Sequence, residues 1–183
     1  KDEDVTHLSP KEWNDVIENE DYVMIDTRNT YETNLGIFET AIDPRLNNFN
    51  EFPEYVKNAG IPKDKRVLMY CTGGIRCEKA LLEMKKQGYK DVSQLDGGIL
   101  NYMKEFPNKY FNGECFVFDH RVSVDQELNP SKQYKLCVHC GDPGDQDITC
   151  IRCEAQQRIC KPCKQDPTPS RFIQPQTGIW ETV

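Results

Sequence analysis

Apolar and polar residues in the first hundred positions follow two alternating patterns. Two largely apolar runs, 22–25 and 66–70, are typical of strands buried on both faces, and 92–95 gives a further strand. Between them lie polar segments with apolar residues at helical spacing, such as 76–87. Because strands and helices alternate along the chain, the sequence predicts an α/β fold with a parallel sheet flanked by helices.

Specific residues mark the ends of two predicted helices. Ser9 and Glu12 form a capping-box pattern around Pro10, a residue that suits the first turn of a helix. Gly88 follows the 76–87 helix and is a natural C-terminal stop. We therefore expect the first helix to begin at Pro10 and the later one to end before Gly88.

The pattern changes after about residue 107. One more strand is predicted at 114–119, and a polar stretch at 129–131 is interpreted as a linker. We expect three parts: a main domain with a C-terminal extension at 1–128, a small cysteine-rich module at 129–164 and an irregular tail at 165–183.

Composition and charge narrow the possible partners. The formal charge of −7 argues against a large basic surface for nucleic acid on this chain alone. No apolar run approaches the roughly 20 residues of a membrane-spanning helix, and the N-terminus lacks a secretory pattern. We expect a cytoplasmic protein without a membrane partner. Because the chain begins with Lys1, we also expect a fragment or processed form that lacks an upstream domain.

The strand at 66–70 leads directly into a loop that begins with a cysteine and contains two glycines and an arginine. This Cys71 loop consists of Cys71, Thr72, Gly73, Gly74, Ile75 and Arg76. Its glycines allow backbone N–H groups to point inward as an anion-binding nest, and the following helix adds the positive end of its dipole. A thiolate placed there has a lowered pKa and is a good nucleophile. We therefore predict Cys71 and Arg76 as catalytic residues, with the rest of the loop and Cys77 binding the anion.

The loop resembles the active-site loop of the rhodanese family, in which six residues beginning with the nucleophilic cysteine surround a persulfide. Two other segments are similar to family patterns, 25–28 with Glu32 and the glycine pair in 95–98, and the resemblance covers about residues 6–106. Residues 36–41 depart from it, because they lack the histidine that many rhodaneses have there. Cysteine phosphatases place five residues between cysteine and arginine, and the four found here disfavour that chemistry.

A narrower resemblance is to the rhodanese-related tRNA uridine hydroxylases. It rests on four segments, 26–29, 51–56, 71–80 and 113–122. This resemblance implies oxygen-dependent formation of 5-hydroxyuridine at the tRNA wobble position, with tRNA as the partner. Bacterial members of that family carry an extra N-terminal domain, and we expect its absence here to affect binding of tRNA.

Two further cysteines lie near the loop in sequence or in the predicted sheet. Cys77 stands six positions after Cys71, near the start of the helix. It is either a packed helix residue or a second thiol that resolves a persulfide or sulfenate on Cys71 by disulfide exchange. Cys115 lies in an apolar strand and is interpreted as part of the core.

The cysteine-rich module contains three C-x-x-C pairs, Cys137/Cys140, Cys150/Cys153 and Cys160/Cys163. Without a secretory pattern, such pairs indicate a metal site in preference to disulfides, and a closed site of four thiolates favours structural zinc. Our first choice of ligands is Cys137, Cys140, Cys160 and Cys163, because an outer-pair arrangement resembles the tail of the bacterial hydroxylases. Cys150 and Cys153 are the alternative, or the ligands of a second metal, and His139 is expected to be exposed to solvent.

Two other functions remain open on the sequence alone. In the first, Cys71 takes sulfur from a small sulfane donor such as thiosulfate and passes it on as a persulfide. In the second, the chain is a non-catalytic interaction module stabilised by zinc.

Overall fold

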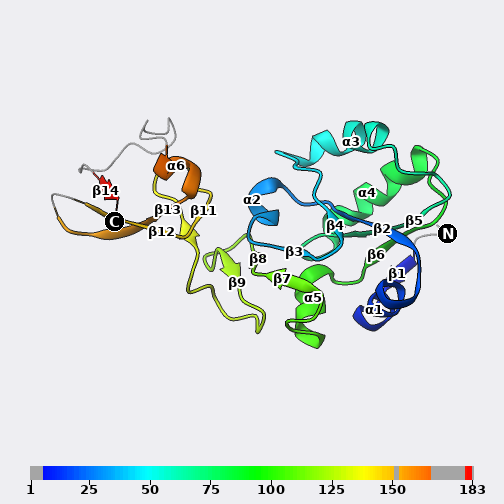
Figure 1. The fold of residues 1–183 in the computed structure, drawn as a ribbon, viewed down its shortest axis with the longest axis horizontal. Helices are drawn as coiled ribbons and strands as arrows, with labels where there is room; N and C mark the ends of the chain where they lie inside the picture. Colours follow the sequence, from blue (N-terminus) through cyan, green and yellow to red (C-terminus); the bar gives the residue numbers. More distant parts are fainter. Residues whose placement is uncertain (1–5, 151–152, 166–179, 183) are drawn as a thin grey trace. The chain divides into compact units, whose positions relative to one another are not determined.

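The computed structural model describes residues 6–150, 153–165 and 180–182 of the chain, which divides into two compact units. The first unit is Lys1–Phe116 with Asp125–Asn129, and the second is Val117–Val124 with Pro130–Val183. The elements of both are labelled in Figure 1. No described helix is long and apolar enough to cross a membrane.

The first unit is built on a parallel sheet of five strands in the order β1-β6-β5-β2-β4. Their bounds are β1 (Thr6–Leu8), β2 (Tyr22–Asp26), β4 (Ala41–Ile42), β5 (Arg66–Tyr70) and β6 (Val92–Leu95). The three strands predicted from the apolar runs and from 92–95 are therefore present, and the rhodanese-like α/β fold is confirmed. β5 lies between β6 and β2, which explains its continuous apolar sequence.

Helices cover both faces of this sheet. They are α1 (Pro10–Asn19), α2 (Thr30–Thr33), η1 (Phe49–Glu51), α3 (Phe52–Asn58), α4 (Ile75–Lys86) and α5 (Gly98–Glu105). Figure 1 shows α3 and α4 on one face and α1 and α5 on the other. The capping box at Ser9 and Glu12 is formed, and α4 ends two residues before Gly88, so both predicted helix ends are confirmed.

Alternate side chains of β5 enter the two halves of the core. Val67 and Met69 pack with Leu81 of α4 and other buried residues on one side of the sheet. Tyr70 meets Phe38 and Trp13 in edge-on ring contacts. All of these side chains are fully buried. Burial of each large apolar side chain stabilises the folded state by ~1.5–3 kcal/mol. The end of β5, where the Cys71 loop begins, is therefore fixed by packing on both sides.

The end of the first unit differs from the sequence prediction. A short pair, β3 (Gly36–Phe38) and β7 (Phe111–Gly113), is antiparallel, and β8 (Cys115–Phe116) follows. The strand predicted at 114–119 is thus shorter than expected. Its last part turns back, because the N–H of Val117 donates to the carbonyl of Val122, which has a positive φ of 66°.

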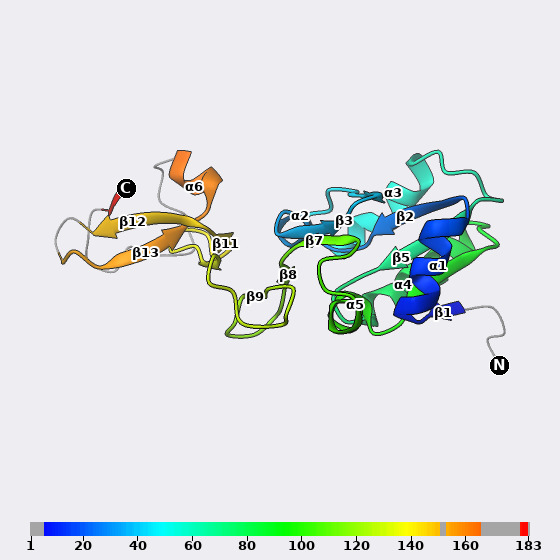
Figure 2. The ribbon, with the colours of Figure 1, turned by 60° about the horizontal axis from the view of Figure 1, so that its bottom comes forward.

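The described residues of the second unit form short strands and one short helix. They are β9 (Ser123–Val124), β10 (Lys135–Leu136), β11 (Pro143–Gly144), β12 (Gln146–Cys150), β13 (Gln156–Ile159), α6 (Lys161–Gln165) and β14 (Trp180–Thr182). β10 pairs with β11, and β12 pairs with both β13 and β14, all antiparallel. Figure 2 shows β12 and β13 as a hairpin followed by α6.

Two features of the second unit bear on the predictions. Its buried cluster is small, containing only Ile148 and Ile159 with two cysteines among the described residues. Residues 166–179 and 183 of the predicted irregular tail lie outside the described residues, whereas 180–182 form β14.

Candidate active site and candidate metal centre

Cys71 lies at the carboxyl end of β5, where the chain enters the loop that leads to α4. Only 2% of the residue is exposed, whereas Gly73 and Ile75 of the same loop lie at the surface. The N–H of Gly74 donates to the Cys71 Sγ over 3.1 Å. Gly74 has a φ of 91° and is the N-cap of α4, so a side chain there would be strained. The sulfur therefore lies beneath a surface loop whose amide points toward it.

The surroundings of Cys71 favour its thiolate form. The pKa of Cys71 is lowered to about 6, first by a hydrogen bond from the thiol of Cys77. Burial opposes this shift, and the Cys77 N–H, the charge of Arg76 and the Gly74 N–H contribute to it. Since the ordinary value is 9.0, the site holds a nucleophilic sulfur anion near neutral pH.

The start of α5 holds the outer side of the Cys71 loop. The N–H of Ile99 donates to the Cys71 carbonyl over 3.0 Å, and the N–H of Leu100 donates to the Thr72 carbonyl over 3.2 Å. A Cβ at Gly98, whose φ is 65°, would lie 2.6 Å from both carbonyl oxygens. These contacts hold the first two carbonyls of the loop toward α5, while the Gly74 amide points to the sulfur. The sequence showed the glycine pair but not this contact.

Arg76 is oriented by a buried carboxylate from another element. Its Nη1 and Nη2 each donate to Glu32 over 2.6 Å, and the side chain of Glu32 is fully buried. The Thr72 hydroxyl donates to the same carboxylate over 3.4 Å. Burial would lower the pKa of Arg76, but the hydrogen bonds and charge of Glu32 raise it. The predicted catalytic arginine is thus held in a bidentate pair beside the sulfur.

A second, wholly buried ion pair lies at the end of β2. Arg28 donates to Asp26 over 2.7 Å and to the Gly36 carbonyl over 2.6 Å, and neither charged side chain is exposed. The guanidinium also lies 5.8 Å from the ring centres of Tyr70 and Phe111. A buried pair of this kind fixes geometry more than it adds stability. It joins the chain segments behind the Cys71 loop.

The other two cysteines of the first unit are both buried. Cys77 lies in the first turn of α4, and its Sγ is 3.6 Å from the Thr27 Oγ1. Burial, together with the neighbouring Cys71, raises the pKa of Cys77 well above its ordinary value. Burial also raises the pKa of Cys115 to about 12. Cys115 is thus placed in the core, as expected, whereas Cys77 lies against the reactive sulfur.

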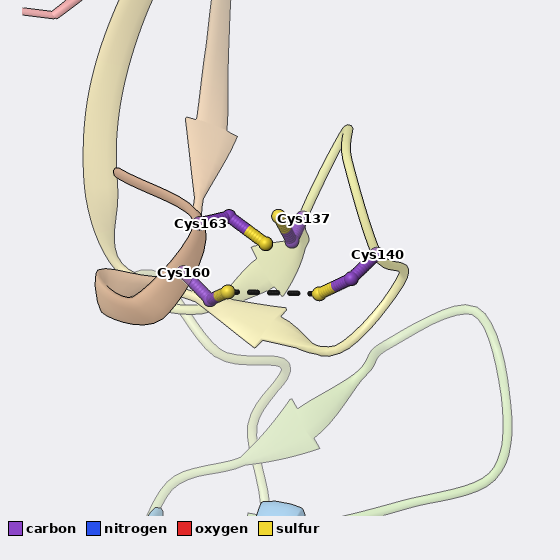
Figure 3. A group of neighbouring side chains, drawn as sticks. All are labelled: Cys137, Cys140, Cys160 and Cys163. Atoms are coloured by element: carbon purple, nitrogen blue, oxygen red, sulfur yellow. Dashed lines mark hydrogen bonds between the residues drawn. The ribbon is translucent and has the colours of Figure 1, made fainter. Parts of the chain in front are cut away.

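Four of the six paired cysteines come together in the second unit. They are Cys137, Cys140, Cys160 and Cys163, whose sulfur atoms all lie within 4.8 Å of one another. Figure 3 shows the four sulfur atoms pointing toward a common centre. Cys140 Sγ and Cys160 Sγ are 3.6 Å apart. This four-cysteine cluster is the set chosen first from the sequence, and Cys150 and Cys153 are not among its members.

Local turns bring these four residues together. The N–H of Gly141 donates to the Cys137 carbonyl over 2.9 Å, and Gly141 has a φ of 83°. The N–H of His139 points at the Cys137 sulfur over 3.4 Å. In a tetrahedral zinc–thiolate site with Zn–S near 2.3 Å, the sulfur atoms lie about 3.8 Å apart. The observed spacing and the all-thiol donor set therefore suit such an ion, and His139 is not in the cluster.

The chain is an α/β protein whose cysteine follows a central parallel strand. This cysteine opens a loop in which a backbone amide points to its sulfur. The chain belongs to the family of rhodanese-like domains, whose model matches residues 9–105. A second model, described as rhodanase C-terminal, matches residues 112–170. The crystal structure of the Alr3790 protein from Anabaena has this fold, with a TM-score of 0.50 and 16% identity over 58% of this chain and 91% of that one.

Curated relatives match across both units. A tRNA uridine(34) hydroxylase of Bdellovibrio bacteriovorus is 60% identical over 86% of this chain and 45% of its own length. A protein of the same name from Picosynechococcus is 45% identical over 91% of this chain and 56% of its own length. The chain therefore spans about half the length of these relatives. The names agree with the narrower resemblance found in the sequence.

Proposed function

We propose that the chain is the catalytic part of an enzyme that hydroxylates the wobble uridine of tRNA to 5-hydroxyuridine. The observation that supports this most directly is the Cys71 thiolate in its ring of donors. The relatives named tRNA uridine(34) hydroxylase match through this loop and on into the second unit. Cys71 acts as the essential thiol, and Arg76, Thr72, Gly73, Gly74 and Ile75 form the anion-binding loop.

Binding of tRNA, a polyanion, requires positive charge beyond what this chain carries. The net charge of −7 provides no broad basic surface, and the chain spans about half of its relatives. The proposal therefore assigns part of tRNA binding to a further N-terminal domain of the full protein. Because tRNA is the substrate, the proposal also places the enzyme in the cytoplasm.

Modification of tRNA in cells tests the proposal. In cells that lack the gene, we expect wobble 5-hydroxyuridine to fall, measured by mass spectrometry of digested tRNA. The wild-type gene should restore it, and the Cys71→Ser gene should not. An unchanged level in the deletion strain, or full restoration by Cys71→Ser, would contradict the proposal. Cys115→Ser is the matched control, since Cys115 is a buried cysteine with a raised pKa.

A sulfurtransferase is the second candidate, because the same donors would also stabilise a persulfide anion on Cys71. The Cys71 thiolate would then attack the outer sulfur of thiosulfate and release sulfite, and cyanide would take the persulfide sulfur as thiocyanate and restore the thiolate. Rapid thiocyanate formation that is lost in Cys71→Ser would favour this function. A non-catalytic module is disfavoured by the lowered pKa of Cys71, since a scaffold has no need of an ionised thiol.

We further propose that the four-cysteine cluster binds one structural zinc ion. The support is its all-thiol donor set and its tetrahedral spacing. The ion would hold the second unit together and takes no part in the reaction. Elemental analysis should give one zinc per chain in the wild type and a lower content in Cys160→Ser.

A further inference from the structure

Cys77 lies between two groups that can each accept a hydrogen bond from its thiol. Its side chain is fully buried in the first turn of α4. On one side is the Cys71 sulfur, which receives hydrogen bonds from the Cys77 thiol and N–H. On the other side is the Thr27 Oγ1, 3.6 Å from the Cys77 sulfur.

The Thr27 hydroxyl is arranged to accept a hydrogen bond from the Cys77 thiol. The Thr27 Oγ1 donates its own proton to the Tyr70 carbonyl over 2.9 Å. Its oxygen therefore has lone pairs available for the thiol. Thr27 directly follows β2 and is fully buried, so the acceptor for the Cys77 thiol is a protein group and not solvent. The Cys77 S–H can therefore donate a hydrogen bond to Thr27 or to Cys71, and an ionised Cys71 is the stronger acceptor of the two.

The charged groups around the pair favour an uncharged Cys77. Burial is the largest cause that raises the pKa of Cys77, and the Cys71 anion and Asp26 of β2 add to it, whereas the hydrogen bond with Thr27 lowers it. Arg76 of α4 faces Cys71 and is itself paired with Glu32 of α2. One sulfur can therefore ionise while the other keeps its proton.

We propose that Cys77 is a positioning residue, a permanently neutral thiol that turns its S–H from Thr27 to Cys71 when Cys71 ionises. In this role Cys77 forms no covalent bond and exchanges no electrons. It differs from a resolving cysteine, which must form a disulfide with Cys71. The inference rests on the proposed function only in that Cys71 acts as a thiolate.

The pH dependence of Cys71 alkylation tests the inference without any tRNA. The full chain is treated with iodoacetamide across a pH range, and labelling of the Cys71 peptide is followed by mass spectrometry. In the wild type, the rate should have its midpoint near a pH of about 6. In Cys77→Ala the midpoint should rise by at least about one pH unit, or roughly tenfold in the ionisation constant. An unshifted midpoint in Cys77→Ala would overturn the inference.

Two further variants separate a donor from a packing or disulfide role. Cys77→Ser keeps a hydrogen-bond donor and cannot form a disulfide, so we expect a midpoint closer to wild type than that of Cys77→Ala. Cys115→Ala removes a buried thiol of the same unit and should leave the midpoint unchanged. A shift in Cys115→Ala equal to that of Cys77→Ala would overturn the inference, because general loss of packing would then explain both.

The outcomes also distinguish this inference from the proposed function. A wild-type midpoint near 9 would remove the thiolate itself and with it the proposed chemistry. A midpoint near 6 that Cys77→Ala does not move would remove only the role of Cys77. Loss of all tRNA modification in Cys77→Ser, with a normal midpoint, would show that the second sulfur itself is required, and would contradict the inference that Cys77 forms no covalent bond.

Discussion

The two units use the same residue type, cysteine, in opposite ways. In the first unit the Cys71 sulfur receives hydrogen bonds from backbone N–H groups and from Cys77, and it lies beside a guanidinium. In the second unit four sulfurs face one another within 4.8 Å. A sulfur among donors is prepared for reaction, whereas sulfurs that converge are prepared for a metal ion. The surroundings of each sulfur, not its spacing in sequence alone, decide which use applies.

The units also differ in what stabilises them. The first has aromatic and aliphatic side chains buried on both faces of a five-stranded sheet. Among the described residues, the main buried cluster of the second is only Ile148 and Ile159 with two cysteines. On the zinc proposal, the bound ion supplies the stability that so small a cluster cannot. This contrast should appear when either unit is perturbed separately.

Metal removal should give the largest effect. Structural zinc contributes roughly 10–16 kcal/mol in small zinc modules, so a strong chelator should unfold the second unit and leave the first folded. Hydrogen exchange at Ile148 should become fast, while exchange at Val67 should stay slow. Cys163→Ser should reproduce the effect, and Cys153→Ser, an exposed cysteine outside the cluster, should not. Slow exchange at Ile148 after complete chelation would contradict the zinc proposal.

A methyl group at Gly98 should disturb the first unit through the Cys71 loop. The added Cβ would lie 2.6 Å from the carbonyl oxygen of Cys71 in a backbone of positive φ. We expect Gly98→Ala to lower the free energy of unfolding by about 1–3 kcal/mol and to slow alkylation of Cys71. Gly73→Ala is the control, since among the described residues no heavy atom lies within 4 Å of its Cβ. Equal denaturation midpoints for the two variants would refute the steric account.

Neutralising Glu32 should lower stability by a similar amount, through the loss of the ion pair with Arg76. Glu32→Gln keeps the size of the side chain but removes the charge that pairs with Arg76. Leaving a largely buried cation without its counter-charge should destabilise the fold by about 1–3 kcal/mol. Glu18→Gln is the matched surface control, since Glu18 pairs with Lys109 in solvent. Similar unfolding curves for both variants would mean that Glu32 does not hold Arg76.

The last expected effect is a pH dependence of stability, of which only a part is present near neutral pH. Because the pKa of Cys71 is lowered to about 6 in the folded chain, against an ordinary value of 9.0, the unfolded chain binds more protons between these values. Stability from this group is therefore fully present above the ordinary value and is lost as pH falls toward about 6. Denaturant titrations of wild type and Cys71→Ser should diverge as pH rises through this window. Curves that stay parallel would count against an ionised Cys71.

Local sequence was enough to predict much of this structure. The strand at 66–70, the capping box at Ser9 and the glycine turn after Cys71 are each determined by neighbours in the chain. These features place the loop at the end of a central strand. The rhodanese-like fold could therefore be predicted from the sequence.

Contacts between distant residues could not be predicted in the same way. Glu32 and Arg76 are 44 positions apart, and only the folded chain brings them together. The contact of Gly98 with the Cys71 carbonyl likewise joins two strand ends that are separate in sequence. The strand at 114–119 was predicted too long because its apolar pattern gives no sign of the turn at Val122. Spacing alone also left open which two cysteine pairs would meet.

Direct titration of the Cys71 thiol tests the central claim most closely. The ultraviolet absorbance of thiolate is measured against pH in the wild-type chain, and the Cys71→Ser titration is subtracted to remove the contribution of the remaining cysteines. If the loop holds a sulfur anion, the difference between the two titrations should have its midpoint at a pH of about 6. A midpoint at or above the ordinary 9.0 would contradict the account.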